Sequence, residues 1–478
     1  MTLDPRFIEG LQEIVGPPHV LHHPEDVVGY EQDAFLVARA LPDVVVLPAS
    51  TEEVAAVVRL AAEKGMPVIA RGAGTGLNGG SIPIAGGLMV VLARMKRIHA
   101  IDPRSRIAVV DPGVVNVDLS AAAAPYGLFY APDPGSQTVS TIGGNIGNNA
   151  GGPHCLFYGV TSNHILSLEL VLPTGAVTWV GSPNGELPGY DLCGIVVGSE
   201  GTLGVITKAI VRLLPLAEAV RTLLAVFESI DDASEAVSAV IASGIVPAAM
   251  EMMDAMVISA VEAAIHAGYP ADAGAVLLIE VEGDREALPR LVDRIAAICR
   301  HHRSRVISTA ATEQERQLLW KGRKEGAGAL GRLAPSYYLH DGVVPRTKLP
   351  EVMRRVAEIG RAYHLPIGNL FHAGDGNLHP VIPFDPREPN VFERVVRAGE
   401  AILRACVEAG GTITGEHGVG IEKRDYMRWL FTEADLGAMW RVKRAFDPRG
   451  TMNPGKLLPG DGDPAFERRP GTAAGMWT

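Results

Sequence analysis

The amino-acid sequence predicts an α+β protein with more than one domain. At 478 residues, the chain exceeds the length that a single hydrophobic core usually organises. Its second half repeats a strand–helix–strand pattern, which is typical of helices layered on a sheet. Its first half carries three glycine-rich stretches between short β-like segments, and glycine allows the backbone to approach a ligand closely.

Composition and charge argue against several classes of protein. Hydrophobic residues make up 47% and charged residues 20% of the chain, as in ordinary globular proteins. The formal net charge of −11 argues against a nucleic-acid or anionic-membrane binder, because both need a basic surface. No apolar run approaches the roughly 20 residues of a membrane span. The first residues show neither the basic nor the apolar region of a signal peptide.

The cysteines indicate neither a disulfide scaffold nor a metal site. No two of them form a C-x-x-C pair or another metal-binding spacing. A reduced, cytoplasmic environment fits this usage better. The four are Cys155, Cys193, Cys299 and Cys406.

A β–α–β unit is expected in the first domain after an N-terminal helix. Residues 44–76 predict a strand, a helix capped by Ser50 or Thr51, a second strand and a glycine-rich loop. The loop has the spacing G-x-G-x-x-G at 74–79, but a dinucleotide fingerprint needs a following helix, and residues 81–92 predict strand and turn. Its successive N–H groups can still bind phosphate, with a tight surface turn as the alternative.

Two further stretches favour a ligand over a simple turn. Residues 132–152 are rich in glycine and asparagine, and residues 198–207 form a third glycine-rich stretch. Structural turns rarely need this much glycine in three places. A large planar cofactor with a pyrophosphate does need it, because backbone must approach such a cofactor along its length.

A second α+β layer is expected after residue 216. Residues 222–254 and 275–308 each predict strand, helix and strand. Residues 390–411 predict an amphipathic helix whose stripe of Val391, Val395, Ile402 and Cys406 packs in the core. Residues 445–459 form a loop punctuated by proline and glycine, and a loose tail follows.

The segment HAGDGNLHP, residues 372–380, places two histidines around a stretch that disfavours a helix. Gly-Asp-Gly-Asn is turn chemistry, and the flanking sequences are apolar and strand-like. We therefore predict strand, tight turn and strand. His372 and His379 would face each other with Cβ atoms roughly 5 Å apart, which suits two rings that share one ion.

Six motifs occur together in one order: PVIARGAGTGLNGG, PDPGS with TIGGNIGNNAGG, GSEGTLGVIT, HAGDGNLHP, GEHGVG and FDPRGTMNPGK. Together they resemble the FAD-linked 2-hydroxyacid oxidase/dehydrogenase family, which includes the flavin subunit of bacterial glycolate oxidase, D-lactate dehydrogenases and D-2-hydroxyglutarate dehydrogenase. The resemblance extends over residues 40–458. Within it, residues 319–346 are most similar to the glycolate oxidase flavin subunit.

This resemblance implies the fold of vanillyl-alcohol oxidase and para-cresol methylhydroxylase. Residues 1–216 would form the FAD-binding domain, with an N-terminal helix and two α+β subdomains. Residues 217–420 would form an α+β substrate or cap domain. Residues 421–478 would return to the FAD-binding domain and end in the loose tail.

The resemblance also assigns FAD-binding residues. The first stretch would hold the pyrophosphate, the second would line the flavin and the third would contact the adenosine side. The first loop contains no histidine for covalent attachment, so the FAD is expected to be non-covalent. The assigned residues are Arg71, Gly72, Ala73, Gly74, Thr75, Gly76, Gly80, Ser81, Pro134, Gly135, Ser136, Thr141, Gly143, Gly144, Asn145, Gly151, Gly201, Gly204, Ile206 and Asn453.

A metal site is expected from His372, His379 and Glu416. Glu416 and His417 are adjacent between glycines, and on extended backbone they would point in opposite directions. The two histidines and the glutamate make an N₂O set with open positions, which suits a catalytic Zn²⁺ or Mn²⁺. The alternative is that each histidine is a hydrogen-bonded turn residue. His417 is the candidate general base, because an imidazole titrates near working pH.

Arg323 is the candidate clamp for a substrate carboxylate, because its planar fork can bind one bidentately. Its position within LWKGRKEG is equally compatible with a solvated helix face. The resemblance implies that the D-2-hydroxyglutarate branch carries a lysine at the position of Leu339, where it would reach a second carboxylate. This difference favours a small monoacid over a diacid.

The implied function is oxidation of a small 2-hydroxy acid, glycolate or D-lactate, with hydride transfer to flavin N5. The alternatives are a D-2-hydroxyacid dehydrogenase of broader or longer-chain specificity, a transferase that resembles alkyl-glycerone-phosphate synthase, and a non-enzymatic flavin-binding subunit. The resemblance implies iron–sulfur and second flavin-domain subunits as partners. It is compatible with a homodimer and with a cytoplasmic protein that reaches the inner face of the membrane through its partners.

Overall fold

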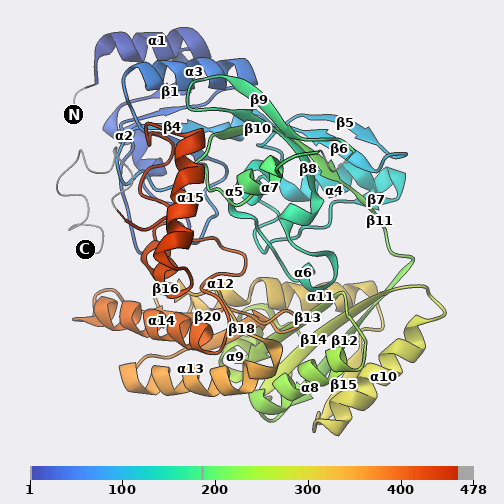
Figure 1. Ribbon diagram of the computed structural model, residues 1–478. Coiled ribbons are helices and arrows are strands. Elements are labelled where there is room, and N and C mark those ends of the chain that lie inside the picture. The colour runs from blue at the N-terminus through green and yellow to red at the C-terminus, as the bar shows by residue number, and fades with distance from the viewer. Residues whose placement is uncertain (1–2, 185–187, 461–478) are drawn as a thin grey trace. The chain divides into compact units, whose positions relative to one another are not determined.

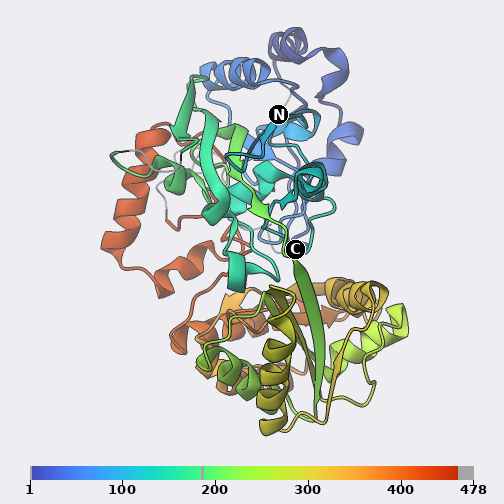
Figure 2. The same ribbon diagram turned by 90° about the vertical axis from the view of Figure 1, so that its right-hand side faces the viewer.

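The computed structural model describes residues 3–184 and 188–460, which divide into two compact units (Figures 1 and 2). Unit 1 comprises the chain up to Gly151, Val160–Leu216 and the segment from His417 onward. Unit 2 comprises Gly152–Gly159 and Ala217–Glu416. Both units combine helices with sheets, which confirms the α+β class. The helices of the described residues lack the combined length and apolar character of a membrane span.

The first sheet of unit 1 has four strands in the order β1-β2-β4-β3. The two pairings of β4 are parallel, because α3 forms the crossover between β2 and β3. Helices α1 and α3 bury their apolar faces in the same core as this sheet. The elements are α1 (Pro5–Val15), β1 (Val20–Leu21), α2 (Pro24–Val27), β2 (Val44–Val46), α3 (Thr51–Glu63), β3 (Val68–Arg71) and β4 (Leu88–Val91).

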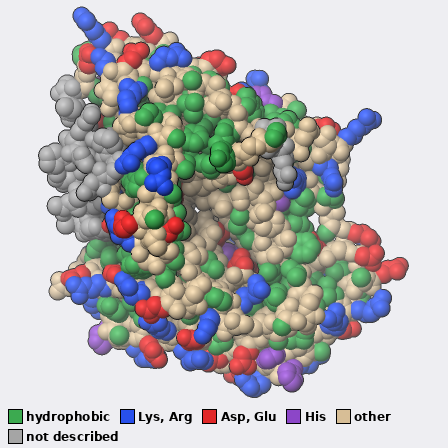
Figure 3. All heavy atoms as spheres, viewed as in Figure 1, with side chains coloured by type: hydrophobic (Ala, Val, Ile, Leu, Met, Phe, Trp, Pro, Cys, Tyr) green, Lys and Arg blue, Asp and Glu red, His purple; other side chains and the backbone are tan. Residues whose placement is uncertain are grey.

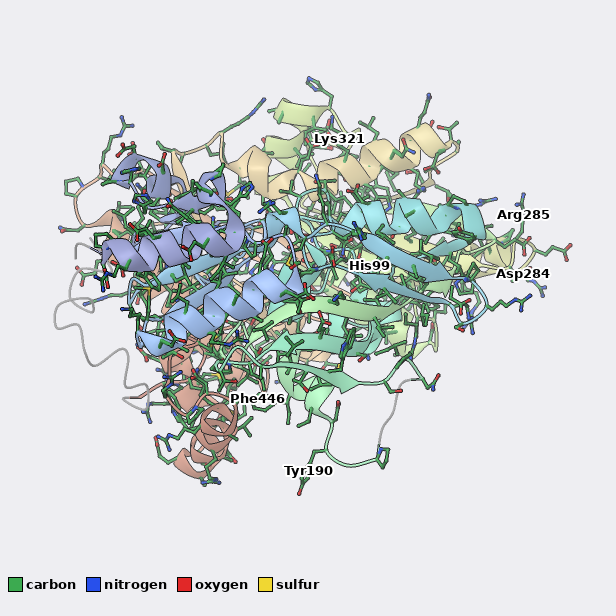
Figure 4. The ribbon with its side chains drawn as sticks, turned by 90° about the horizontal axis from the view of Figure 1, so that it is seen from above. His99, Tyr190, Asp284, Arg285, Lys321 and Phe446 are labelled. Atoms are coloured by element: carbon green, nitrogen blue, oxygen red, sulfur yellow. The ribbon has the colours of Figure 1, made fainter. Side chains whose placement is uncertain are left out.

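The second sheet of unit 1 has five antiparallel strands in the order β5-β6-β10-β8-β9. Its core includes Ile142 and Ile146 of α5, and Phe446 of α15 packs against it (Figure 4). The elements are β5 (Ile98–Asp102), β6 (Ile107–Val110), α4 (Asn116–Ala123), β7 (Leu128–Phe129), α5 (Ile142–Asn148), β8 (Ile165–Val171), β9 (Val177–Gly181), α7 (Leu192–Val196), β10 (Val205–Arg212), β11 (Leu214–Pro215) and α15 (Glu433–Phe446).

Unit 2 is built on a nine-stranded sheet whose main path runs β15-β12-β14-β13-β18-β19-β17, with β20 paired to β18 and β16 to β20. Its strands are β12 (Ala219–Phe227), β13 (Ala249–Asp254), β14 (Ala275–Gly283), β15 (Val306–Thr309), β16 (Ser336–Leu339), β17 (Gly342–Val343), β18 (Gly368–His372), β19 (Asn377–Leu378) and β20 (Pro380–Phe384). Its helices are α6 (Cys155–Tyr158), α8 (Ile230–Ala242), α9 (Ala255–Ile265), α10 (Leu288–His301), α11 (Glu313–Lys324), α12 (Gly326–Leu330), α13 (Leu349–Tyr363) and α14 (Val391–Glu408).

Helices cover both faces of this sheet, and strand β14 shows how the faces are divided. Val276 packs in one cluster with Val257 of α9, and Leu278 packs with Trp320 of α11. Side chains alternate along a strand, so the residues between them, including Leu277, point to the opposite face. Helices α8 and α10 also pack on β12 and β14. On the face of the molecule drawn in Figure 3, positive and negative side chains are interspersed.

Most predicted elements of the chain are present. The N-terminal helix is α1, and the β–α–β unit is β2, α3 and β3, with the Ser50 side chain accepting the Glu53 N–H at 3.3 Å. No helix follows the first glycine-rich loop. Helix α14 buries the predicted stripe. The predicted tail, residues 461–478, lies outside the described residues.

Two features differ from the sequence-based expectation. Helix α5 forms inside the second glycine-rich stretch, because Ile142 and Ile146 give it an apolar face despite its glycines. Residues 152–159 were expected in the first domain but belong to unit 2. The reason is local packing, since Leu156 contacts Gly374 closely and α6 packs against β13.

A buried lysine connects the C-terminal segment to the third glycine-rich stretch within unit 1. The Lys443 ammonium donates to Asp447 Oδ2 at 2.6 Å, Thr202 O at 2.7 Å and Met452 O at 2.9 Å. All three of its donors are therefore used. Helix α15, drawn in red, accordingly lies among elements from early in the chain (Figure 1).

We predict that Lys443→Ala lowers the free energy of unfolding of unit 1 by about 3 kcal/mol or more, because it leaves the Asp447 carboxylate buried without its cation. Chemical denaturation followed by tryptophan fluorescence measures the change. Arg441→Ala, at an exposed position of the same helix, is the control and should shift stability little. Equal stabilities of the two variants would contradict the assigned role of Lys443.

Candidate active site

The two histidines of the sequence motif meet on a hairpin of unit 2. Strands β18 and β19 pair with His372 opposite Asn377, so His379 is the diagonal neighbour and not the direct partner that was expected. The two rings still lie edge to face, with centroids 5.0 Å apart. The turn requires Gly376, whose φ is +84° and whose Cβ would lie 2.1 Å from the Val344 carbonyl oxygen.

Both imidazoles direct Nε2 at one carboxylate oxygen. Glu416 Oε1 lies 3.1 Å from His372 Nε2 and 3.0 Å from His379 Nε2. The ligand atoms of these three residues lie within 4.8 Å of one another. The sequence-predicted trio is therefore assembled within one unit.

The other ring nitrogen, Nδ1, of each histidine has a hydrogen-bond partner of its own. His372 Nδ1 lies 2.8 and 2.9 Å from the two Glu251 oxygens, and His379 Nδ1 donates to the His340 carbonyl oxygen at 3.1 Å. A histidine whose Nδ1 proton is held in this way can present the Nε2 lone pair to a metal ion, which is the usual arrangement of a metal-ligating imidazole.

Burial and charge act against each other in this cluster. Burial by itself would lower the pKa of His372, but the charges of Glu251 and Glu416 raise that pKa well above its ordinary value. Burial would raise the pKa of Glu416, but the neighbouring His372 holds it well below the ordinary value. The carboxylates thus favour a positive charge at the position that a divalent cation would take. Two imidazoles and one carboxylate fit Zn²⁺ or Mn²⁺ with open positions.

Asp341 organises the segment that carries Glu416. Its carboxylate accepts the Glu416 N–H at 3.1 Å, the Asn377 side chain at 2.9 Å and the Thr414 hydroxyl at 2.5 Å. Residues 415–417 form bends, so the extended backbone expected around Glu416 is wrong. The sequence reasoning also missed Asp341, although the polar pair His340-Asp341 directly after strand β16 is a usable signal.

Arg323 is buried in the last turn of α11, so the solvated-face interpretation is wrong. Its Nη2 lies 2.5 Å from Glu251 Oε2 and 3.5 Å from His372 Nδ1. Glu251 was not predicted. Its signal is a carboxylate in the middle of the apolar run AAMEMM.

The boundary between the units falls between Glu416 and His417, so His417 belongs to unit 1. Its carbonyl oxygen accepts from the Asn148 side chain at 2.9 Å. Beyond it, the N–H groups of Val419 and Gly420 donate to the buried Glu200 carboxylate at 2.7 and 2.8 Å. Burial raises the pKa of Glu200 to about 7 even with these hydrogen bonds.

The three glycine-rich stretches come together in unit 1. A Cβ on Gly72 would lie 2.4 Å from Thr141 Oγ1, so the first and second stretches are in close contact. The Asn453 side chain donates to Gly80 O at 2.8 Å and Glu200 O at 2.6 Å, which joins the first and third stretches. Arg71 is buried and donates to Gln32 O and the Ser81 hydroxyl.

Some assigned residues have a packing role of their own. A Cβ on Gly143 would meet Pro112, and one on Gly204 would meet the Val171 carbonyl oxygen. Ile206 packs its side chain in the core of the five-stranded sheet. The remaining assigned residues of the first loop, including Ala73, Gly74, Thr75 and Gly76, lie together between β3 and β4. Pro134, Gly135, Ser136, Gly144, Gly151 and Gly201 lie in the second and third stretches.

Several buried polar atoms in the three glycine-rich stretches and at Asn453 lack a hydrogen-bond partner among the described residues. They are Asn78 Nδ2, Ser140 Oγ, Thr141 Oγ1, Asn145 Nδ2 and Asn453 Oδ1. An unpartnered buried donor or acceptor is costly, so their concentration here indicates that a polar ligand supplies the partners. The pyrophosphate, ribose and ring edges of FAD carry groups of this kind.

Comparisons with known proteins show the family to which the chain is similar. Residues 42–181 match the family described as FAD binding domain, and residues 216–457 match FAD linked oxidases, C-terminal domain. The glycolate oxidase subunit GlcD of Escherichia coli (strain K12) is 44% identical, covering 94% of this chain and 90% of that protein. The subunit of the same name from Bacillus subtilis (strain 168) is 40% identical, covering 95% of this chain and 97% of that protein. A D-lactate dehydrogenase of Archaeoglobus fulgidus is 35% identical over 91% and 96%.

Solved structures share the fold. A 4-ethylphenol oxidase from Gulosibacter chungangensis has a TM-score of 0.80 at 19% identity, covering 95% of this chain and 97% of its own. Para-cresol methylhydroxylase has a TM-score of 0.80 at 17% identity over 95% and 96%. An alkyldihydroxyacetonephosphate synthase has a TM-score of 0.76 at 19% identity over 95% and 86%. These matches confirm the predicted para-cresol methylhydroxylase fold, and at such identities they speak for the fold alone.

We predict that His379→Ala and Glu416→Ala each abolish stoichiometric binding of Zn²⁺ or Mn²⁺, because two ligands remain where the cluster offers three. Metal analysis after dialysis against each cation measures the loss. His301→Ala removes an exposed histidine of the same unit and should retain the metal. Full metal content in either cluster variant would refute this assignment.

Proposed function

This chain belongs to the FAD-linked oxidase family and is an FAD-linked oxidoreductase, and we propose that it oxidises a small 2-hydroxy acid, glycolate or D-lactate, to the 2-oxo acid. The observation that carries the proposal is the buried cluster of His372, His379 and Glu416, in which both Nε2 atoms face one carboxylate oxygen. Such a cluster suits a substrate with adjacent hydroxyl and carboxylate oxygens, since both can bind one cation. Relatives described as glycolate oxidase subunits and D-lactate dehydrogenases support the substrate class.

Two groups would supply chemistry that side chains lack. Bound non-covalently in the glycine-rich stretches of unit 1, FAD would accept the hydride from the substrate carbon. A divalent cation held by His372, His379 and Glu416 would lower the pKa of the substrate hydroxyl. The rest of the reaction falls to the protein's own residues.

His417 is proposed to take the hydroxyl proton. His417 directly follows Glu416, which is one of the proposed ligands of the cation. Asn148 holds the His417 carbonyl oxygen and Glu200 holds the N–H groups of Val419 and Gly420, so the backbone from His417 to Gly420 is fixed. A fixed base in hydrogen-bond reach of the proton is what general-base catalysis needs.

Arg323 is proposed to bind the substrate carboxylate. Its guanidinium is buried beside His372, and its Nε has no hydrogen-bond partner among the described residues. A buried free donor next to the metal ligands is suited to an anionic oxygen.

The side chain at position 339 favours a monoacid. Leu339 lies on β16 opposite Val381 of β20, and it packs at the border of an apolar cluster. It offers no charge to a second carboxylate. The alternative is a D-2-hydroxyacid dehydrogenase that accepts longer chains, and the similarity to D-lactate dehydrogenases is the observation that supports it.

The electrons are proposed to leave through partner proteins in the cytoplasm or at the inner face of the membrane. The four cysteines show no spacing suited to an iron–sulfur cluster. Two similar proteins are described as subunits of glycolate oxidase. Partners that carry an iron–sulfur centre and a second flavin domain would complete the path.

We predict that His417→Ala loses at least 100-fold in the rate of flavin reduction while keeping FAD, because general-base catalysis typically contributes about 10²–10⁴-fold. Anaerobic stopped-flow reduction by glycolate and by D- and L-lactate measures the rate and tests the substrate class together. FAD released by acid reports cofactor content. Near-wild-type reduction by the variant would remove His417 from the mechanism, and no reduction of the wild type by any 2-hydroxy acid would refute the proposed function.

We also predict that O₂ reoxidises the reduced protein much more slowly than substrate reduces it, whereas artificial dyes accept its electrons rapidly. The reason is the proposed transfer to partners. Stopped-flow reoxidation with O₂ and with a dye measures both rates. Reoxidation by O₂ that matches the rate of reduction would identify a self-sufficient oxidase.

A further inference from the structure

Glu251 is a fully buried carboxylate placed between two proposed functional residues of unit 2. It lies on β13, with His372 opposite it on β18. Its oxygens lie 2.8 and 2.9 Å from His372 Nδ1, and Oε2 lies 2.5 Å from Arg323 Nη2. All three side chains are at most 8% exposed.

Stability alone does not account for this arrangement. The strand residues on the same face as Glu251, Ala249 and Met253, are buried and apolar, and an apolar residue at position 251 would continue that face. Buried ion pairs often add little net stability compared with well-packed hydrophobic residues of similar volume. The charge therefore calls for a function at the two side chains it contacts.

We propose that Glu251 is a positioning residue that serves the metal ligand and the substrate clamp together. It accepts the Nδ1 proton of His372, which directs Nε2 toward Glu416, and the same carboxylate holds Arg323 beside that ring. The cation site and Arg323 then share one anchor on β13. This inference rests on the metal role in the proposed function.

A second buried glutamate on the same face provides the contrast. Glu280 on β14 accepts from the Thr222 hydroxyl at 2.5 Å, Trp320 Nε1 at 2.6 Å and Arg316 Nη1 at 3.1 Å. Burial would raise the pKa of Glu280, but the hydrogen bonds from His154 and Thr222 hold it at about 2. Glu280 fixes the first two turns of α11, and its hydrogen-bond partners among the described residues are His154, Thr222, Arg316 and Trp320, not His372.

The spacing of α11 explains how both glutamates are covered. Arg316, Trp320 and Arg323 lie on one face of the helix, four and then three residues apart. The first two contact Glu280 and the third contacts Glu251. Glu280→Gln is therefore a matched control, because it changes a buried, multiply bonded glutamate under the same helix.

The test is a titration of the chelator-treated flavoprotein with Zn²⁺ and with Mn²⁺. Glu251→Gln keeps the volume of the side chain but removes the charge from the His372 contact. The variant should bind both cations about 10–100-fold more weakly, which is typical when a residue behind a ligand is lost. FAD content should be unchanged, and Glu280→Gln should bind the cations as the wild type does.

Arg323→Gln tests the direction in which cation affinity changes. It removes the same buried ion pair but leaves the Glu251 carboxylate on His372 and takes a positive charge away from the cation site. It should bind the cations as tightly as the wild type or more tightly. A purely structural role for the pair predicts weaker binding in both variants.

Three results would overturn the inference. They are wild-type affinity in Glu251→Gln, equal losses in Glu251→Gln and Glu280→Gln, and weaker cation binding in Arg323→Gln. Weaker cation binding in Arg323→Gln would overturn the inference even if Glu251→Gln does not fold. If the wild type itself binds neither cation, the metal role in the proposed function fails with it, whereas a failure confined to the variants leaves that role intact.

Discussion

The candidate site depends on one constraint, which is that a buried imidazole can present a chosen nitrogen only if its other nitrogen is held. His372 is held by Glu251 and His379 by the His340 carbonyl oxygen. Without these contacts, each ring could turn or change tautomer, and the two Nε2 atoms would not converge on Glu416 Oε1. The hairpin brings the rings together, but the atoms behind them decide which nitrogen faces the centre.

In unit 1 the main constraint is different: the backbone must approach other backbone segments and a ligand closely. Gly72, Gly143 and Gly204 each occupy positions where a Cβ would meet another segment of the chain. These glycines allow three segments far apart in the sequence to lie together, and Asn453 connects two of them through its side-chain amide. The buried polar atoms left without partners among the described residues of these stretches mark where FAD would supply hydrogen bonds.

Local pattern predicted much of the fold and part of the site. The β–α–β unit, the amphipathic helix α14 and the hairpin at 372–379 follow from periodicity and turn chemistry, which act over a few residues. The register of the hairpin, the bends at 415–417 and helix α5 did not follow, because pairing geometry and tertiary packing set them. Glu251 and Asp341 were missed for the same reason, since their roles arise from residues more than 30 positions away in the chain. A carboxylate in the middle of the apolar run AAMEMM was the one usable signal for Glu251.

The position of Arg323 reconciles two roles that at first compete. The Glu251 carboxylate already neutralises part of the positive charge of the Arg323 guanidinium. This pairing argues against strong binding of a second anion, the substrate carboxylate. Yet Arg carries five N–H donors, and the structure leaves Nε buried and without a partner among the described residues. An unpaired buried donor is unfavourable until an acceptor arrives, so binding of a substrate carboxylate would relieve that cost. Glu251 therefore does not exclude the clamp: it fixes the guanidinium in one orientation, and a donor fixed before binding loses less entropy when the acceptor arrives.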